Sequence, residues 1–240
     1  LLQEFLARSA GRWGDGPLRA HAEVARSGAP FAVVSQLVRC AAAVSPGDEP
    51  AARAARIRAT VERVVPGERA HHVAEFLAEV SGAPASAEGA SHALRAARVD
   101  ASLLADALAD AWVAWLRGRC DRGLTCLVVE DLQWGDAASV KLLDAGLEAL
   151  HDRPLLVVAT ARDDAREAFP ELWTRRSLEV IHLGALPRRA AEQIVREALR
   201  SDVDDATVAA IVERSGAHPF HLEELVRAVA SGRSPDELPD

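Results

Sequence analysis

Apolar residues recur at two different spacings along the chain, and each spacing predicts a different kind of element. Between residues 101 and 117 they fall every three or four positions, which is the repeat of a helix with one buried face. Residues 124–131 and 153–162 are instead continuous apolar runs, typical of strands that are buried on both faces. A weaker run of the second kind occupies residues 177–186. The tryptophans of the helical segment are expected in the core.

The remaining segments predict mostly helices. Residues 1–10 match the body of a helix, residues 18–24 a short strand, and residues 30–44 another helix. Residues 45–98 are alanine-rich stretches divided by turn signals, so we expect a helical insertion made of short helices and loops.

Predicted strands alternate with amphipathic helices as far as residue 186, and only helices follow. This alternation predicts an α/β fold with a parallel sheet that helices cover on both faces. After Pro187, three helical segments separated by turn residues predict a small helical subdomain. We therefore divide the chain into an α/β core at 1–186 and a helical unit at 187–240.

The composition excludes several classes of protein. The chain has 240 residues, of which 49% are apolar and 27% charged, as is usual for a globular protein. A net charge of -8 argues against nucleic acid as a direct partner, which would favour a basic surface. No apolar run approaches the ~18 residues that span a bilayer, and the three cysteines form no CxxC pair. We expect a cytoplasmic protein without a membrane partner.

Two adjacent carboxylates, Glu130 and Asp131, end the most hydrophobic predicted strand. Ligands of parallel sheets bind at the carboxyl ends of the strands. One carboxylate at that edge can hold a hydrated Mg²⁺, and a second can orient or deprotonate a water for attack on a phosphate. The alternative, to which we give similar weight from spacing alone, is a polar strand end, with Asp136 as the cap of the next helix.

Arg162 ends the next predicted strand along the chain. If the two strands are adjacent, its guanidinium lies at the same edge of the sheet as the acids, where it can contact a terminal phosphate. Taken alone, an arginine at a strand end is more often simply solvated.

Three stretches, LVVEDLQWGDAAS, PLLVVATARD and ERSGAHPFHLEELVRAV, follow one another in this order. Together they resemble the AAA-like ATPase module of STAND-class signalling NTPases, found beside bacterial serine/threonine kinase domains and in large LuxR-type regulators. The resemblance covers the chain from about Asp100 onward, and LLQEFLARSA resembles the helix that follows a P-loop. It implies a P-loop NTPase-like core with a C-terminal helical lid, and ATP or ADP with Mg²⁺ bound between them.

The resemblance also implies roles for single residues. Glu130 would bind Mg²⁺, and Asp131 would orient the attacking water. Arg162 matches a sensor residue that contacts the nucleotide, and Trp134 matches a packing residue. Pro219 matches the proline of the lid that lies against the base, although alanine replaces the glycine usual two positions before it.

The phosphate-binding loop of this family is missing from the sequence. No GxxxxGK[ST] occurs, and the only lysine, Lys141, follows no glycine loop, so this chain is expected to bind ATP poorly or not at all. The chain opens on Leu1 and contains no methionine, so we expect the loop and its strand upstream in a longer protein. That strand is central in the order 5-1-4-3-2. Without it, we predict that the 177–186 run either pairs directly with the 153–162 strand or is poorly ordered.

These expectations combine into one function and one alternative. The chain would be the central part of an ATP-binding, STAND-type switch, attached to a kinase, a transcription regulator or another output domain. Mg²⁺-dependent ATP hydrolysis is expected of the longer protein and not of this chain alone. The alternative is a nucleotide-independent scaffold or protein-interaction module with the same fold. A DNA-processing ATPase is disfavoured by the acidic charge balance.

Overall fold

The computed structural model describes residues 1–26, 28–199 and 203–233. Its contacts group into two units, Leu1–Leu178 and Glu179–Asp240, and each unit is described by itself. The first unit holds the sheet with most of the helices, and the second is a small helical unit.

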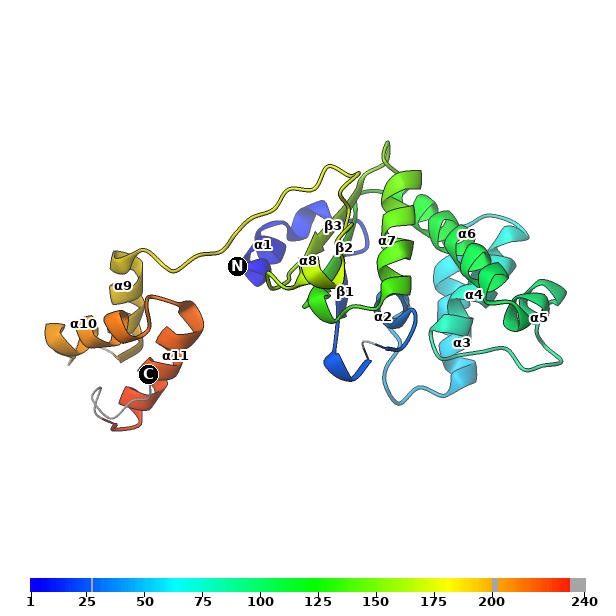
Figure 1. Cartoon of the computed structure of the whole chain (residues 1–240). Helices are drawn as coiled ribbons and strands as arrows, with labels where there is room; N and C mark the ends of the chain where they lie inside the picture. The colour runs from blue at the N-terminus through cyan, green and yellow to red at the C-terminus, as the bar shows by residue number, and fades with distance from the viewer. Residues whose placement is uncertain (27, 200–202, 234–240) are drawn as a thin grey trace. The chain divides into compact units, whose positions relative to one another are not determined.

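The first unit contains a three-stranded parallel sheet with β2 in the centre (Figure 1). The strands are β1 (Leu18–His21), β2 (Thr125–Glu130) and β3 (Leu155–Ala159), in the order β1-β2-β3. In the register of the sheet, Leu127 lies between Leu18 of β1 and Val157 of β3. The predicted mixed α/β fold with a parallel sheet is therefore confirmed.

Alternate residues of β2 contribute to two different cores, one on each face of the sheet. Leu127 and Val129 belong to the large core shared with most of the helices. Cys126 and Val128 point to the other face, into a small cluster with residues at the N-terminus of the chain, where α1 (Leu2–Arg8) lies. All four side chains are at most 1% exposed, which confirms that this strand is buried on both faces.

Six helices build the large core of the first unit. They are α2 (Ala32–Ala41), α3 (Pro50–Glu62), α4 (Arg69–Val80), α5 (His92–Val99), α6 (Ala101–Cys120) and α7 (Ala137–Ala149). Helix α7 stands beside the strands, α6 packs against α7, and α3 to α5 lie beyond α6 (Figure 1). The predicted helix at 101–117, its buried tryptophans and the short helices of the 45–98 insertion are all confirmed.

Short elements complete the first unit between these helices and strands. They are the 3-10 turns η1 (Ala10–Arg12), η2 (Val24–Arg26) and η3 (Leu132–Trp134), and the one-turn helix α8 (Ala165–Ala168). Turn η3 and helix α8 follow β2 and β3 respectively and contact each other. Both therefore lie at the carboxyl end of the sheet.

The expectation that the 153–162 run is buried on both faces is wrong. The strand is shorter, Leu155–Ala159, and most of its side chains are only half-buried. Leu156 is 36% exposed. The reason is its position, because β3 is the last strand on its side of the described sheet and neighbours cover it less completely than β2.

The expected strand at 177–186 is not formed. These residues carry no regular secondary structure, and Val180, Ile181 and Leu183 are exposed. They do not pair with β3, so the first of the two outcomes predicted for this run is also wrong. An apolar run becomes a strand only where a partner edge satisfies its backbone groups.

The second unit is a bundle of α9 (Arg188–Leu199), α10 (Asp205–Arg214) and α11 (Pro219–Ala230). Its own core includes Val195, Ile211 and Leu222. The three helices predicted after Pro187 are confirmed, whereas the division at residues 186 and 187 stays a prediction.

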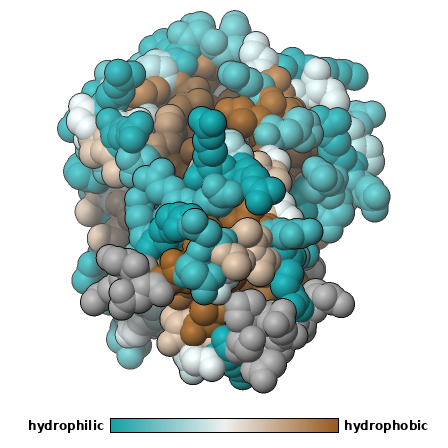
Figure 2. All heavy atoms as spheres, turned by 90° about the vertical axis from the view of Figure 1, so that its left-hand side faces the viewer, coloured by the Kyte–Doolittle hydropathy of each residue, from teal (hydrophilic) through white to brown (hydrophobic). Residues whose placement is uncertain are grey.

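Hydrophilic side chains cover much of the face shown in the space-filling view, with apolar ones between them (Figure 2). Among the described residues, no helix combines the length and apolar character needed to cross a membrane.

Candidate functional site

The carboxyl end of β2 is held to the end of β3 by contacts that continue beyond the strand ladder. Asp131 follows the strand with a φ of 57°, a left-handed conformation that Asp tolerates better than most residues, and so turns the chain into η3. The Asp131 amide donates to Thr160 Oγ1 at 3.2 Å, and the Leu132 amide donates to the Thr160 carbonyl at 2.9 Å. The two strand ends are thus fixed next to each other.

A buried glutamine bridges the predicted acid and the predicted arginine. Gln133 is 8% exposed; its Nε2 donates to Asp131 Oδ1 at 3.3 Å, and its Oε1 accepts from the Arg162 amide at 3.2 Å. Arg162 therefore lies at the same edge of the sheet as Glu130 and Asp131. Its guanidinium lies over the Trp134 ring, 5.2 Å from the centroid, in a cation–π contact.

Each of the two acids faces a basic side chain from β1. Glu130 Oε1 accepts from Arg19 Nη2 at 2.6 Å, and Asp131 Oδ2 lies 3.6 Å from His21 Nδ1. Sequence reasoning missed both partners, because neither belongs to a motif. Arg19 and His21 alternate along the predicted 18–24 strand, however, so both point to one face of the sheet. That alternation was the available signal.

These ion pairs are only partly shielded from water. The side chains of Arg19 and Glu130 are 39% and 29% exposed, so their attraction is weakened by solvent and contributes about 0–1 kcal/mol. A cation approaching Glu130 would compete with the Arg19 guanidinium for the same carboxylate oxygen. Arg19 therefore offsets the charge of Glu130, whereas His21 offsets that of Asp131 only when its ring is protonated.

The two acids could bind a magnesium ion, whereas the chain lacks the groups that usually bind a triphosphate. Mg²⁺ keeps several waters and commonly takes one or two protein carboxylates beside phosphate oxygens, which Glu130 and Asp131 can provide. Within the described ranges, no group of three or more His, Cys, Asp and Glu side chains could hold a metal ion. A phosphate cradle with backbone amides and a lysine is missing from the sequence, and Lys141 lies exposed on α7.

A third carboxylate, Asp136, fixes the segment that follows the acids. It is 4% exposed and caps α7 by accepting from the Ser139 amide at 2.7 Å, as predicted. It also accepts from the amides of Phe31 at 2.7 Å and Val33 at 3.2 Å, at the start of α2. Ser139 Oγ adds a bond from the Val34 amide at 3.1 Å. The starts of α2 and α7 are thus joined.

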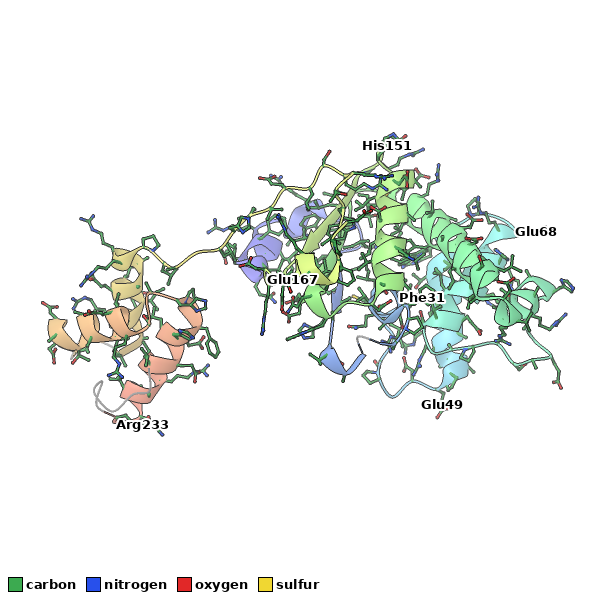
Figure 3. The ribbon with its side chains drawn as sticks, in the orientation of Figure 1. Phe31, Glu49, Glu68, His151, Glu167 and Arg233 are labelled. Atoms are coloured by element: carbon green, nitrogen blue, oxygen red, sulfur yellow. The ribbon has the colours of Figure 1, made fainter. Side chains whose placement is uncertain are left out.

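The two ends of the sheet can be followed in the view with side chains. Phe31 and Glu167 lie toward the end where the strands finish, and His151 marks the end where β3 begins (Figure 3). Pro219, the residue predicted to lie near a base, is the first residue of α11 in the second unit, with His218 at the helix cap. Its proposed contact with a nucleotide stays a prediction.

Comparisons of the chain with models of protein families, with curated proteins and with solved structures find no match. The resemblance to the STAND-class module, drawn from the three sequence stretches, stays a prediction. The function is therefore inferred from the residues of the site and their geometry.

Proposed function

We propose that the chain is the central part of an ATP-binding switch of the STAND type, with a P-loop NTPase-like core, in a longer cytoplasmic signalling protein. One observation supports this most. Two adjacent acids lie at the carboxyl end of the buried central strand of a parallel sheet, and Arg162, which follows the neighbouring strand, is held at the same edge through Gln133. This is the edge at which parallel sheets bind ligands.

In this proposal each residue of the edge has a separate task. Glu130 would hold the magnesium ion, which would supply charge neutralisation for the phosphates of ATP. Asp131, whose carboxylate accepts from Gln133, would orient the attacking water. Arg162 would contact the terminal phosphate, and Pro219 would lie against the base.

The output of the switch would lie outside this chain. Nucleotide binding would favour one arrangement of the core and the lid, and an attached kinase, transcription regulator or other output domain would respond to it. Slow hydrolysis would reset the switch. Neither nucleic acid nor a membrane is a direct partner of this chain in the proposal.

A nucleotide-independent scaffold is the second candidate, and one observation favours it. Both acids already contact basic side chains of β1, with Arg19 on Glu130 at 2.6 Å and His21 near Asp131 at 3.6 Å. With Arg19 in place, this strand end needs no ligand to offset the charge of Glu130. The same fold would then serve as a protein-interaction module.

Binding of ATP and Mg²⁺ to a chain extended upstream by about forty residues, enough for a strand and a P-loop, separates the two functions. We expect calorimetry to show binding by the extended chain. Asp131→Asn should retain binding and lose turnover, and Glu130→Gln should weaken the Mg²⁺-dependent part of binding by roughly tenfold.

The matched control is Asp106→Asn, which removes an exposed carboxylate from α6 that has no part in the proposed site. Its binding and turnover should equal those of the unmodified chain. If the extended chain binds no ATP, or if Asp106→Asn and Asp131→Asn have the same effect, the scaffold is the better assignment.

A further inference from the structure

A second polar site lies at the other end of the sheet, where β2 begins. It is a cavity of about 220 Å³ lined by residues 14–15, by residues 122–125 and by Arg119 near the end of α6. Strand β2 spans six residues, so its two ends are roughly 15–20 Å apart. This cavity is therefore separate from Glu130 and Asp131.

The unusual group of this cavity is the buried guanidinium of Arg119. Its side chain is 4% exposed, and its Nε has no hydrogen-bond partner. The Nη1 atom lies 3.5 Å from Asp15 Oδ2, longer than the roughly 2.7–2.9 Å of a charge-assisted hydrogen bond. The guanidinium also lies over the Trp115 ring, 5.4 Å from the centroid. This arrangement leaves donor capacity of the arginine unused.

Burial makes this positive charge unfavourable in the absence of a close anion. It lowers the pKa of Arg119, and neighbouring Arg63 lowers it further, whereas Asp15 opposes the shift. An arginine nevertheless stays protonated, because its ordinary pKa lies so far above neutral pH. A buried charge is stabilised only by close opposite charge and hydrogen bonds, which a single carboxylate at 3.5 Å supplies incompletely.

The lining of the cavity carries more positive than negative charge. Arg119 and Arg122 contribute two positive charges, and Asp15 contributes one negative charge. The carbonyl end of α6 opposes an anion by about half a charge at most, which is less than the excess from the side chains. The local field therefore favours an anion, although the whole chain is acidic.

We propose that this cavity binds a small oxyanion of the size of phosphate, with Arg119 and Arg122 as its ligands. The anion would take the donors that Asp15 leaves unused, and Asp15, whose side chain is 40% exposed, would turn toward solvent. Planar guanidinium groups donate pairs of parallel hydrogen bonds to phosphate and carboxylate oxygens. A cavity of about 220 Å³ has room for such an anion, since cavities of ~150 Å³ hold benzene.

Titration of this 240-residue chain with inorganic phosphate, followed by calorimetry at constant ionic strength in sodium chloride, tests the proposal. Saturable binding is expected. Arg122→Gln, which changes an exposed side chain, should weaken it by roughly tenfold, and Arg119→Met should abolish it. Asp15→Asn should strengthen it by roughly tenfold, because this variant removes the competing negative charge.

A control variant separates this site from general electrostatic attraction. Arg117→Gln removes an exposed arginine from the same helix. It should leave phosphate affinity unchanged. If Arg119→Met does not fold, Arg122→Gln and Asp15→Asn still decide.

Three results would overturn the proposal. They are no saturable binding, equal losses in Arg117→Gln and Arg122→Gln, and unchanged affinity in Asp15→Asn. The last would mean that Asp15 does not compete with phosphate, so that the anion binds elsewhere. Because this chain has no P-loop and the readout is phosphate binding by the chain as it stands, failure of ATP binding at the other end leaves the test valid.

Discussion

Strands β2 and β3 are neighbours with similar apolar sequences, yet the protein buries them to different extents. The core residues of β2 are at most 1% exposed, whereas Leu156 of β3 is 36% exposed. β2 has a strand on each side and side chains packed on both faces, but β3 has only β2 beside it among the described strands. Burial of a strand is therefore decided by its neighbours as much as by its own residues.

The largest expected difference in the free energy of unfolding comes from replacing a leucine with alanine in each of the two strands. Leu127→Ala should lower the free energy of unfolding by about 3 kcal/mol, because it removes a fully buried side chain and leaves a cavity. Leu156→Ala should lower it by less than about 1 kcal/mol, since water already reaches that side chain. Urea unfolding measures both. Equal losses would show that β3 is as well covered as β2.

The second expected effect concerns the carboxylate that fixes the helices next to β2. Asp136→Ala should lower the free energy of unfolding by about 2 kcal/mol, because amides of Phe31, Val33 and Ser139 lose their acceptor. Chemical denaturation measures the loss. Asp110→Ala, on an exposed face of α6, is the control and should change stability by less than about 0.5 kcal/mol. A loss no larger than that of the control would contradict the shared-cap role.

A smaller effect is expected from the link between the ends of the two strands. Gln133→Leu removes both side-chain hydrogen bonds that connect Asp131 and Arg162, and should cost about 1 kcal/mol. Hydrogen exchange of the Arg162 amide should accelerate with it. Gln193→Leu, an exposed change in α9, should leave that amide unaffected. If hydrogen exchange of the Arg162 amide is unchanged in Gln133→Leu, the Gln133 side chain does not bridge the two strand ends.

The smallest expected effect is a pH dependence of stability that comes from Cys126 of β2. Burial raises the pKa of the Cys126 thiol from about 9 to about 11, so the folded protein keeps the proton longer than the unfolded chain does. This contribution to stability is complete below about pH 9 and is lost as the pH rises toward 11.

Urea unfolding under reducing conditions at pH 7, 8.5 and 9.5 measures that dependence. Between the first and last pH, the unmodified chain should lose about 0.8 kcal/mol more than Cys126→Ala. Cys40→Ala, which changes an exposed thiol, should behave like the unmodified chain. Parallel pH profiles for Cys126→Ala and the unmodified chain would rule out this linkage.

The sequence correctly predicted those elements that can be recognised from their own residues alone. β2 and α6 follow from an uninterrupted apolar run and a helical repeat, and both formed as expected. The 177–186 run had the right residues for a strand, but strand formation also needs pairing with a neighbouring strand, which its own residues do not specify. The exposure of β3 was missed for the same reason, because it depends on sheet order.

The candidate site was also predicted only in part. Glu130, Asp131 and Arg162 were found because strand ends are visible in the sequence, and the structure brings them to one edge. Their partners Arg19 and His21 lie more than one hundred residues earlier, and only the register of β1 on β2 brings them there. The repeat of α6 places Arg119 four residues after the buried Trp115, on the same face, but it does not show the cavity that residues 14–15 help to line.

The carboxylate of Asp136 has a consequence for how the first unit can move. Because Asp136 accepts from the first turns of both α2 and α7, a shift of either helix along its axis would break hydrogen bonds that join the two. These bonds therefore oppose separate movement of the two helices. Since α2 also packs against β1, the same carboxylate ties the segment that follows β2 to the edge strand of the sheet.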